Sequence, residues 1–403
     1  MLDQLFQQRS DNLESPEVTL NDWSVFGDQI ESISGESVSV ESSMRLSAVY
    51  SCIGVLSRSM GQLPMHVMRK ENGKIKRATD HPLYYLLHDE PNPFQTSYDW
   101  RETSMVHVNG WGNGQSVIHR SRKGEVTQLE LIHPTATELV KLSNGNYTHT
   151  IADDNGYRTV PLYDMLHIKA IGSCGKRGKS PILQCRESFA MGQAVQKYGN
   201  KFFGGGGRPT AIVSSKGALN KSSWELLQSA WKKAKNALRN EDNTTLLMPA
   251  ELKYDQLTIA PEDAQFLETR KFSRSEINGL YNVPAHMTND LEKATFSNIS
   301  EQAISFVRHT MVPWVIKWEQ ELNRKLFTTA ERNAGYYIKL NLNGLLRGTA
   351  TQRSEFYTKA IRDGWMSRNE VRAMEEMNEV DGLSEFILSA DLQPKEDPNE
   401  QSK

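Results

Sequence analysis

The chain has 403 residues, enough for two or three packed units with a substantial core. Three cysteines without a CxxC pair argue against a disulfide framework and for a reducing compartment, and ten scattered histidines indicate no metal site. The amino terminus has neither a basic start nor a long apolar run, and no segment approaches a membrane span. We therefore expect a soluble, unexported protein without a cofactor.

Charge is distributed unevenly along the chain. Residues 1–41 carry −8 and residues 363–403 carry −7, so residues 42–362 carry +13 within a net charge of −2. A basic body with acidic ends is expected where the body meets a polyanion or acidic protein surfaces. The alternative is that acidic ends are solvated tails, and we prefer it for the last residues, QPKEDPNEQSK.

The first part of the chain after residue 41 is predicted to form an α+β domain. A polar arm leads into a helix from Ser43 to Met60, with Leu46, Val49, Ile53 and Leu56 on one face. A hairpin, a helix from Pro82 to His88 and a helix from Ser97 to about Asn109 follow. We expect His81 and His88 to be capping or half-buried imidazoles. From Gln115 to Pro161 the apolar period is two, which predicts an antiparallel meander.

The segment after this domain resembles a nucleotide-binding loop but has the wrong spacing. A P-loop needs a glycine separated by four residues from Gly-Lys-Ser, and that position before Gly178, Lys179 and Ser180 is Ser173. No strand ending in acidic residues follows that would position magnesium. We interpret Ser180 as a helix N-cap and Pro181 as the first helical residue.

A helix from Pro181 therefore runs to the four glycines Gly204 to Gly207, beyond which the chain turns into a small unit. Ala211 to Ser214, a helix from Ser222 to Leu238, Thr244 to Met248 and Leu252 to Leu257 predict a βαββ arrangement. The other face of its helix is basic and its apolar stripe carries tryptophans, which suits a docking surface or an ordinary solvated face. The residues concerned are Trp224, Trp231, Lys232, Lys233, Lys235 and Arg239.

Helical patterns then dominate the rest of the chain. Glu262 to Tyr281 is amphipathic and ends at Val283-Pro284, and a polar stretch precedes a long helix from Asn298 to about Phe327. Pro313 is expected to kink that helix. A strand from Tyr336 to Leu342 and two helices follow, and the second helix opens with a capping box at Ser367.

This order of elements resembles the HK97-type family of tailed-bacteriophage portal proteins, over about residues 42 to 385. Lys179 departs from the apolar or small residue expected before Ser-Pro in that family. The local motifs that resemble the family are Ala48-Val49-Tyr50-Ser51-Cys52-Ile53, His81-Pro82-Leu83, Gly178 to Pro181, Tyr198 to Gly204 before Pro209, Phe266-Leu267-Glu268, Arg270-Lys271-Phe272, Tyr281-Asn282-Val283-Pro284, and Gly364 with Asn369-Glu370-Val371-Arg372.

The resemblance implies a ring, normally of twelve subunits, at one capsid vertex of the virion, assembled in the bacterial host cytoplasm. Double-stranded DNA would pass through the channel without sequence specificity. The implied partners are further copies of the chain, the large terminase, the major capsid or scaffolding protein and a head-tail adaptor, with no membrane. The implied divisions are an acidic arm (1–41), wing (42–180), first stem helix (181–207), clip (208–262), second stem helix (263–284), tunnel loop (285–298), kinked wing helix and strand (299–345), helical crown (346–390) and disordered tail (391–403).

Short polar side chains in the tunnel loop suit a channel, because a strongly basic lining would hold DNA by counterion release and stop it sliding. An ordinary surface loop is the alternative. The residues expected to line the channel are Thr288, Asn289, Asp290, Glu292, Lys293, Thr295 and Ser297.

No Ser/His/Asp, Cys/His or paired-carboxylate arrangement stands out, so we expect no enzymatic centre. Two other functions remain open from the residues: a packaging ATPase, on the strength of Gly178 to Ser180, and a small-oligomer DNA-binding adaptor that uses the basic 221–239 helix.

Overall fold

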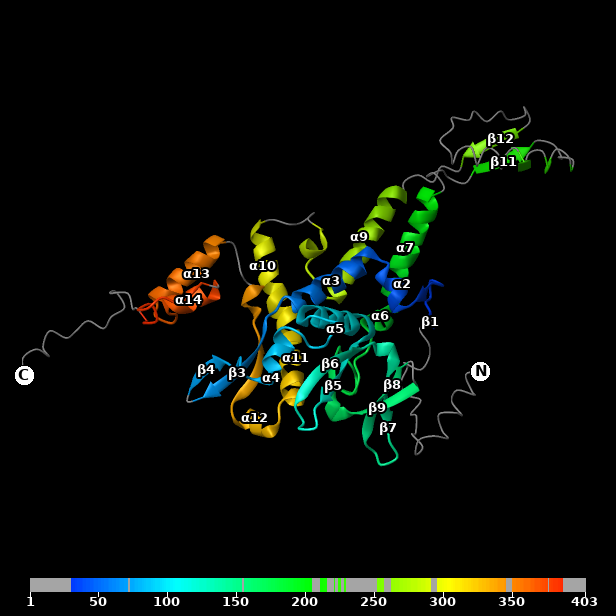
Figure 1. The fold of residues 1–403 in the computed structure, drawn as a ribbon. Coiled ribbons are helices and arrows are strands. Elements are labelled where there is room, and N and C mark those ends of the chain that lie inside the picture. Colours follow the sequence, from blue (N-terminus) through cyan, green and yellow to red (C-terminus); the bar gives the residue numbers. More distant parts are fainter. Residues whose placement is uncertain are drawn as a thin grey trace, which may run out of the picture. The chain divides into compact units, whose positions relative to one another are not determined.

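The computed structural model describes residues 30–71, 73–153, 156–204, 211–215, 252–256, 262–290, 296–345, 350–375 and 377–386, together with residues 221, 224, 225, 228 and 229. The chain divides into two compact units. Of the described residues, those within 48–184 and 278–386 belong to the first unit, and those within 30–47 and 185–277 belong to the second. Figure 1 labels the elements of both units.

Helix α3 (Ser47–Gly61) supplies a buried stripe to the first unit. Val49, Ile53 and Leu56 are at most 1% exposed, which confirms the predicted helical face. The predicted single helix from Ser43 to Met60 is instead two helices, because α2 (Val40–Met44) ends before Arg45 and α3 begins at Ser47. Arg45 caps α2, so the interruption separates the helices at the boundary of the two units.

The first sheet of this unit combines distant parts of the sequence. Strand β3 (Met65–Glu71) pairs antiparallel with both β4 (Lys74–Arg77) and β13 (Tyr336–Leu340). Helix α4 (Pro82–His88) follows, and the imidazole Nδ1 of its N-cap His81 accepts the backbone N–H of Leu83. His81 is thus the capping residue that its position before Pro82 predicts.

The predicted meander is divided between two three-stranded antiparallel sheets. Strand β5 (Asn113–Arg120) lies between β6 (Val126–Ile132) and β10 (Met165–Lys169), whereas β7 (Thr137–Lys141), β8 (Tyr147–Asp153) and β9 (Gly156–Pro161) form their own sheet. The 3₁₀ turn η2 (Pro134–Ala136) separates β6 from β7, and η3 (Leu162–Asp164) separates β9 from β10. A period of two therefore identified strands but not their partners.

Two tryptophans from distant helices meet in the core of the first unit. Trp100 on α5 (Ser97–Trp111) and Trp318 on α11 (Val312–Leu326) are both fully buried, with ring centroids 5.3 Å apart in edge-to-face geometry. Each indole N–H has a partner, since Trp100 donates to Ser116 Oγ and Trp318 approaches Met105 Sδ at 3.3 Å. This contact fixes the long helix against the amino-terminal part of the unit.

The long predicted helix is built from three consecutive segments. α10 (Phe296–Phe306) begins two residues before the expected Asn298, and a π-helical turn, η5 (Val307–Met311), precedes α11. Pro313 lies in the first turn of α11, directly after this π-helical turn. The kink expected at Pro313 stays a prediction. The remaining elements are α12 (Thr329–Asn333), η6 (Leu342–Gly344), α13 (Ala350–Arg362) and α14 (Arg368–Met374).

Two helices dominate the second unit. α7 (Arg186–Gly204) and α9 (Glu262–Leu280) are joined by a hydrogen bond from Ser188 Oγ to Glu276 Oε1 of 2.8 Å. The last three residues of α9 belong to the first unit. The predicted helix from Pro181 is interrupted at Cys185, because α6 (Pro181–Gln184) precedes α7 as a separate turn. The second unit also contains the strands β1 (Ile30–Glu31), β2 (Ser37–Val38), β11 (Ala211–Ser215) and β12 (Leu252–Gln256), which form two antiparallel pairs.

Candidate nucleic-acid interface

The nucleotide-loop-like segment is a crossing of two backbones. A Cβ added at Gly178 would lie 2.1 Å from Gly112 O, and one added at Gly112 would lie 2.4 Å from the carbonyl carbon of Lys179. Gly112 has φ +84, a conformation that favours glycine. Both glycines are thus required so that the two chain segments can approach.

The N–H groups that would cradle phosphate in a P-loop are already used within the protein. Gly178 N–H donates to Asn113 Oδ1 at 2.9 Å, and Lys179 N–H donates to Ile171 O at 3.0 Å. Ser180 Oγ accepts the N–H of Leu183 and donates to Gly110 O, which confirms its predicted role as an N-cap. The geometry therefore gives no support to the packaging ATPase.

The predicted tunnel loop starts from a firmly held turn at the end of α9. Asn282 has φ 51, in the left-handed region that asparagine tolerates better than most residues. The N–H of Val283 donates to Asn278 O at 2.9 Å, and Tyr281 Oη donates to Asn109 O at 3.2 Å. The chain direction is therefore set before Pro284 begins the loop.

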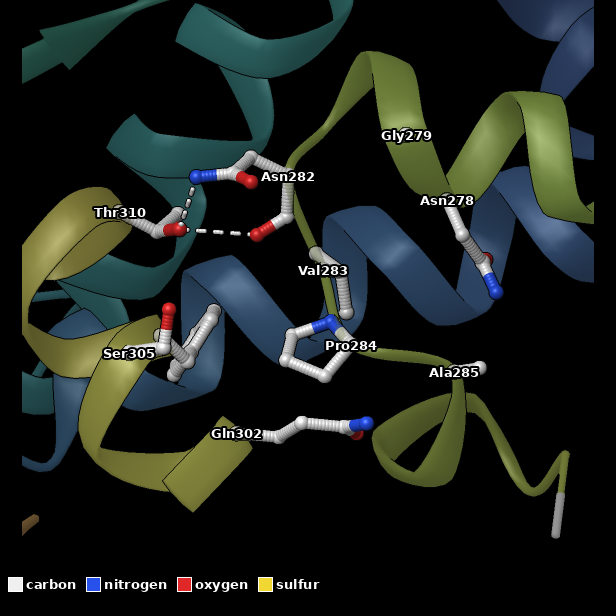
Figure 2. A pocket seen from close by; sticks show the side chains of 10 residues that line it. Asn278, Gly279, Asn282, Val283, Pro284, Ala285, Gln302, Ser305 and Thr310 are labelled. Atoms are coloured by element: carbon white, nitrogen blue, oxygen red, sulfur yellow. Dashed lines mark hydrogen bonds between the residues drawn. The ribbon is translucent and has the colours of Figure 1, made fainter. Parts of the chain in front are cut away.

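A reciprocal pair of hydrogen bonds ties this turn to the π-helical segment. Asn282 Nδ2 donates to Thr310 Oγ1, and Thr310 Oγ1 donates to Asn282 O, both at 2.8 Å. Figure 2 shows both bonds together with Pro284, Gln302 and Ser305 around them. Thr310 belongs to the π-helical turn η5, so these bonds join that turn to the end of α9.

The first part of the loop is a short 3₁₀ helix, η4 (Ala285–Thr288), which is held by a network of hydrogen bonds between buried side chains. Cys52 Sγ donates to Asn278 Oδ1 at 3.0 Å, and Asn278 Nδ2 donates to Thr288 Oγ1 at 2.9 Å. Thr288 Oγ1 in turn donates to Ala285 O at 3.0 Å. Asn278 and Thr288 are each 4% exposed, so this network fixes the loop base in a water-poor environment.

The predicted channel residues consequently differ in their surroundings. Thr288 was expected to line the channel, but its side chain is buried and its hydroxyl accepts a hydrogen bond from Asn278 Nδ2. Asn289 is exposed with φ 62, and Asp290 is half-buried with its N–H bonded to Ala285 O. Ser297 is the second residue of α10, which starts at Phe296 and not at the expected Asn298. Glu292, Lys293 and Thr295 lie outside the described residues.

A cavity of about 250 Å³ lies beside the loop base. Its wall combines polar and apolar residues, and a hydrogen bond of 2.8 Å between His286 Nδ1 and Gln302 Oε1 joins η4 to α10 close to it. Asn278, Asn282 and Thr310, all part of the wall, were not proposed as site residues from the sequence. The signal available was the Tyr281-Asn282-Val283-Pro284 motif, since asparagine before a proline-ended helix is typical of a left-handed turn.

The predicted docking surface is described only in part. Trp224 is helical and 54% exposed, and its role in docking stays a prediction. Trp231, Lys232, Lys233, Lys235 and Arg239 lie outside the described residues, as does the expected strand from Thr244 to Met248.

Within the described part of the chain, no helix is long and apolar enough to cross a membrane, and no group of three His, Cys, Asp or Glu side chains is placed to hold a metal ion.

Comparison with known proteins gives a consistent result. A family model described as phage portal protein matches residues 47–376. The chain is 30% identical to a probable portal protein of Streptomyces phage phiC31 over 87% of this chain and 79% of that protein, and 25% identical to the portal protein of Enterobacteria phage HK97 over 90% and 87%. A solved structure, the neck of a native gene transfer agent particle computed with C12 symmetry, matches at a TM-score of 0.58 and 17% identity, over 93% of this chain and 99% of that one.

Proposed function

The chain belongs to the phage portal protein family, and we propose that twelve copies form a ring around a channel for double-stranded DNA. The ring would occupy one vertex of the capsid in the virion, after assembly in the cytoplasm of the bacterial host. Packaging and ejection of the genome would both use this channel. The packaging ATPase is not supported, because the backbone donors of the loop-like segment are engaged internally.

The observation that best supports a ring is the exposure of apolar side chains on the two long helices of the second unit. Met191 and Tyr198 on α7 are 39% and 48% exposed, and Leu267 and Phe272 on α9 are 54% and 64% exposed. Large apolar surfaces on helices of a soluble protein indicate an interaction site. Neighbouring subunits of a ring would cover these residues, whereas a solvated monomer would leave them in water.

The neck structure solved with C12 symmetry supports the number twelve for this chain. A closed ring repeats one heterologous interface, so every subunit is covered on both sides. We assign residues 181–207 and 263–284 to the stem, 208–262 to the clip, and 42–180 with 299–345 to the wing. Residues 346–390 would form the crown.

Native mass spectrometry of the purified full-length chain tests this assembly. The expected result is a species near twelve times the subunit mass of 45.7 kDa. A population of monomers and dimers at micromolar concentration would contradict the ring and favour the small-oligomer adaptor. Replacing Phe272 with Glu should shift the population towards monomers, whereas Phe94→Glu, on an exposed side chain of the first unit, serves as the matched control.

We assign the segment after α9 to the wall of the channel. The described Asn289 is exposed, and the anchored loop base would hold it in place while DNA passes. Short polar groups contact phosphates of any sequence, and the mixed charges of Asp290, Glu292 and Lys293 avoid a strongly attractive lining. Thr295 and Ser297 complete the proposed wall.

The clip is the proposed docking site for the large terminase and later for a head-tail adaptor, while the major capsid or scaffolding protein would contact the ring elsewhere. An exposed aromatic such as Trp224 supplies an anchor, and basic side chains steer an acidic partner. The double variant Lys232→Glu with Lys233→Glu should weaken terminase binding in a salt-dependent manner while rings still form. Unchanged binding in a pull-down over a salt series would move the docking site elsewhere in residues 208–262.

We also propose that the chain itself is not an enzyme and that the force for packaging comes from a separate motor. Its contribution would be a fixed channel and a docking platform. Measurable ATP hydrolysis by the purified ring, abolished by Lys179→Ala, would contradict this proposal.

A further inference from the structure

A second cavity, in the first unit, has a wall that is unusually rich in lysine. It measures about 240 Å³ and lies between the β7, β8 and β9 sheet, strand β10 with the segment after it, and helix α11. None of the functions proposed above uses it. The polar lining residues that matter here are Tyr147, His149, Lys169, Lys176, Glu321 and Lys325.

The three lysine ammonium groups of this wall bond to neutral oxygens. Lys169 Nζ donates to Gly175 O at 2.6 Å, Lys176 Nζ donates to Tyr147 Oη at 2.5 Å, and Lys325 Nζ donates to Leu162 O. The ion pairs of the described residues do not include any of the three. The lining therefore carries more positive than negative charge, because Lys169, Lys176, Lys325 and Arg324 stand against the single carboxylate of Glu321.

The other charged lining groups do not change this balance. Glu321 is the acidic residue of the wall, and Arg324 binds it through three contacts of 2.6 to 2.9 Å. Its carboxylate also accepts the N–H of His167 at 3.4 Å. Because Arg324 and Glu321 neutralise each other, the net charge of the lining comes from the three lysines.

The buried imidazole of His149 lies among these positive charges. Burial lowers the pKa of His149 to about 4, with further lowering by Arg177, Lys325 and Lys169. Burial also lowers the pKa of Lys325. The nearby Glu321 and Asp164 oppose this effect, whereas Arg324 and Lys169 add to it. His149 is therefore neutral at pH 7. The amide Nε2 of Gln115 donates to Nδ1 of His149 at 3.3 Å, so the ring proton of His149 is on its own Nε2.

We propose that this cavity binds the phosphate group of a small anionic ligand. Lysine is an effective point-charge ligand for phosphate, and neutral donors such as the His149 N–H and Tyr147 O–H complete its coordination. The volume suits a single phosphate rather than a drug-sized ligand. A bound anion would tie the β7, β8 and β9 sheet to α11, and hence stabilise the first unit.

Calorimetric titration of the full-length protein with inorganic phosphate, at fixed ionic strength, tests the site. We expect saturable binding and a thermal midpoint that rises with phosphate but not with chloride. Lys176→Gln and Lys169→Gln should each weaken phosphate binding about tenfold, because each removes a hydrogen bond to a charged group. Lys76→Gln removes the same charge from the exposed strand β4 and should leave phosphate binding unchanged.

Lys176 is exposed, so its replacement leaves the core intact and keeps the test valid even if a half-buried variant folds poorly. Absence of phosphate binding, or equal weakening by Lys76→Gln, would overturn the proposal. A short DNA duplex distinguishes the source of the phosphate. The affinity of the protein for the duplex should be equal in the wild type and in Lys176→Gln. If Lys176→Gln loses duplex binding and the wild type does not bind inorganic phosphate, a site for a small anion is contradicted.

Discussion

Replacing Gly178 with alanine tests the interpretation of the nucleotide-loop-like segment as a backbone crossing. The new Cβ would lie 2.1 Å from Gly112 O and 2.6 Å from Ala170 N, whereas ordinary contacts are 3.4–4 Å. All the opposing atoms belong to the backbone, so no flexible side chain can move aside. The N–H of Gly178 donates to Asn113 Oδ1 at 2.9 Å, and moving residue 178 away from Gly112 and Ala170 by more than 1 Å breaks this bond.

The expected loss of stability combines two effects. Overpacking of a tight contact costs about 1–3 kcal/mol, and loss of a backbone hydrogen bond about 0.5–1.5 kcal/mol. The free energy of unfolding should therefore fall by about 2–4 kcal/mol, which lowers the thermal midpoint by roughly 5–15 °C in a unit of this size. Urea unfolding and differential scanning calorimetry measure these quantities.

Lys179→Ala is the matched control for this experiment. Its side chain is exposed, so the free energy of unfolding should change by no more than about 0.5 kcal/mol. Ring assembly and DNA packaging should be the same as in the wild type. A Gly178→Ala protein as stable as the wild type would refute the crossing. A complete block of packaging in Lys179→Ala with intact rings would instead favour a nucleotide site.

Three further outcomes are expected. Asn278→Ala removes the link between Cys52 and the loop base, which should destabilise the protein by about 1–3 kcal/mol. Hydrogen exchange at residues 285–290 should become faster. Unchanged exchange there would show that the backbone turn alone holds the loop. Lys293→Glu adds a negative charge in every subunit and should alter DNA translocation or retention, measured by packaging assays, without affecting ring assembly; normal retention would exclude an electrostatic role. Burial lowers the pKa values of His107 and His149 to about 4, so the unfolded state takes up protons first as the pH falls. The free energy of unfolding should therefore decrease from pH 6.5 towards pH 4, by on the order of 1–2 kcal/mol per imidazole at pH 5. A urea midpoint that stays constant over that range would contradict the burial of neutral rings.

Local signals in the sequence were sufficient for most helices and their caps. Ser180, His81 and Ser367 cap the helices that their positions predict, because a cap depends on residues within one turn. Helix α9 likewise occupies almost the predicted span.

Features that depend on distant partners were not predictable in the same way. The meander strands are distributed over two sheets because β10 pairs with β5, a contact between segments about fifty residues apart that the period of two does not encode. Thr288 was expected to face the channel, but it bonds to Asn278, a partner that lies on another element. The family resemblance was confirmed by the family model and by the HK97 portal protein. It could be predicted because it depends on the order of many short motifs along the chain and not on contacts between distant residues.

An electron cryomicroscopy reconstruction of the purified full-length chain tests the central claim most directly. We predict a closed ring in which Asn289 lines the channel and the exposed side chains Met191, Leu267 and Phe272 are covered by neighbouring subunits. A small oligomer, or a ring with Asn289 on its outer surface, would contradict the proposed DNA channel.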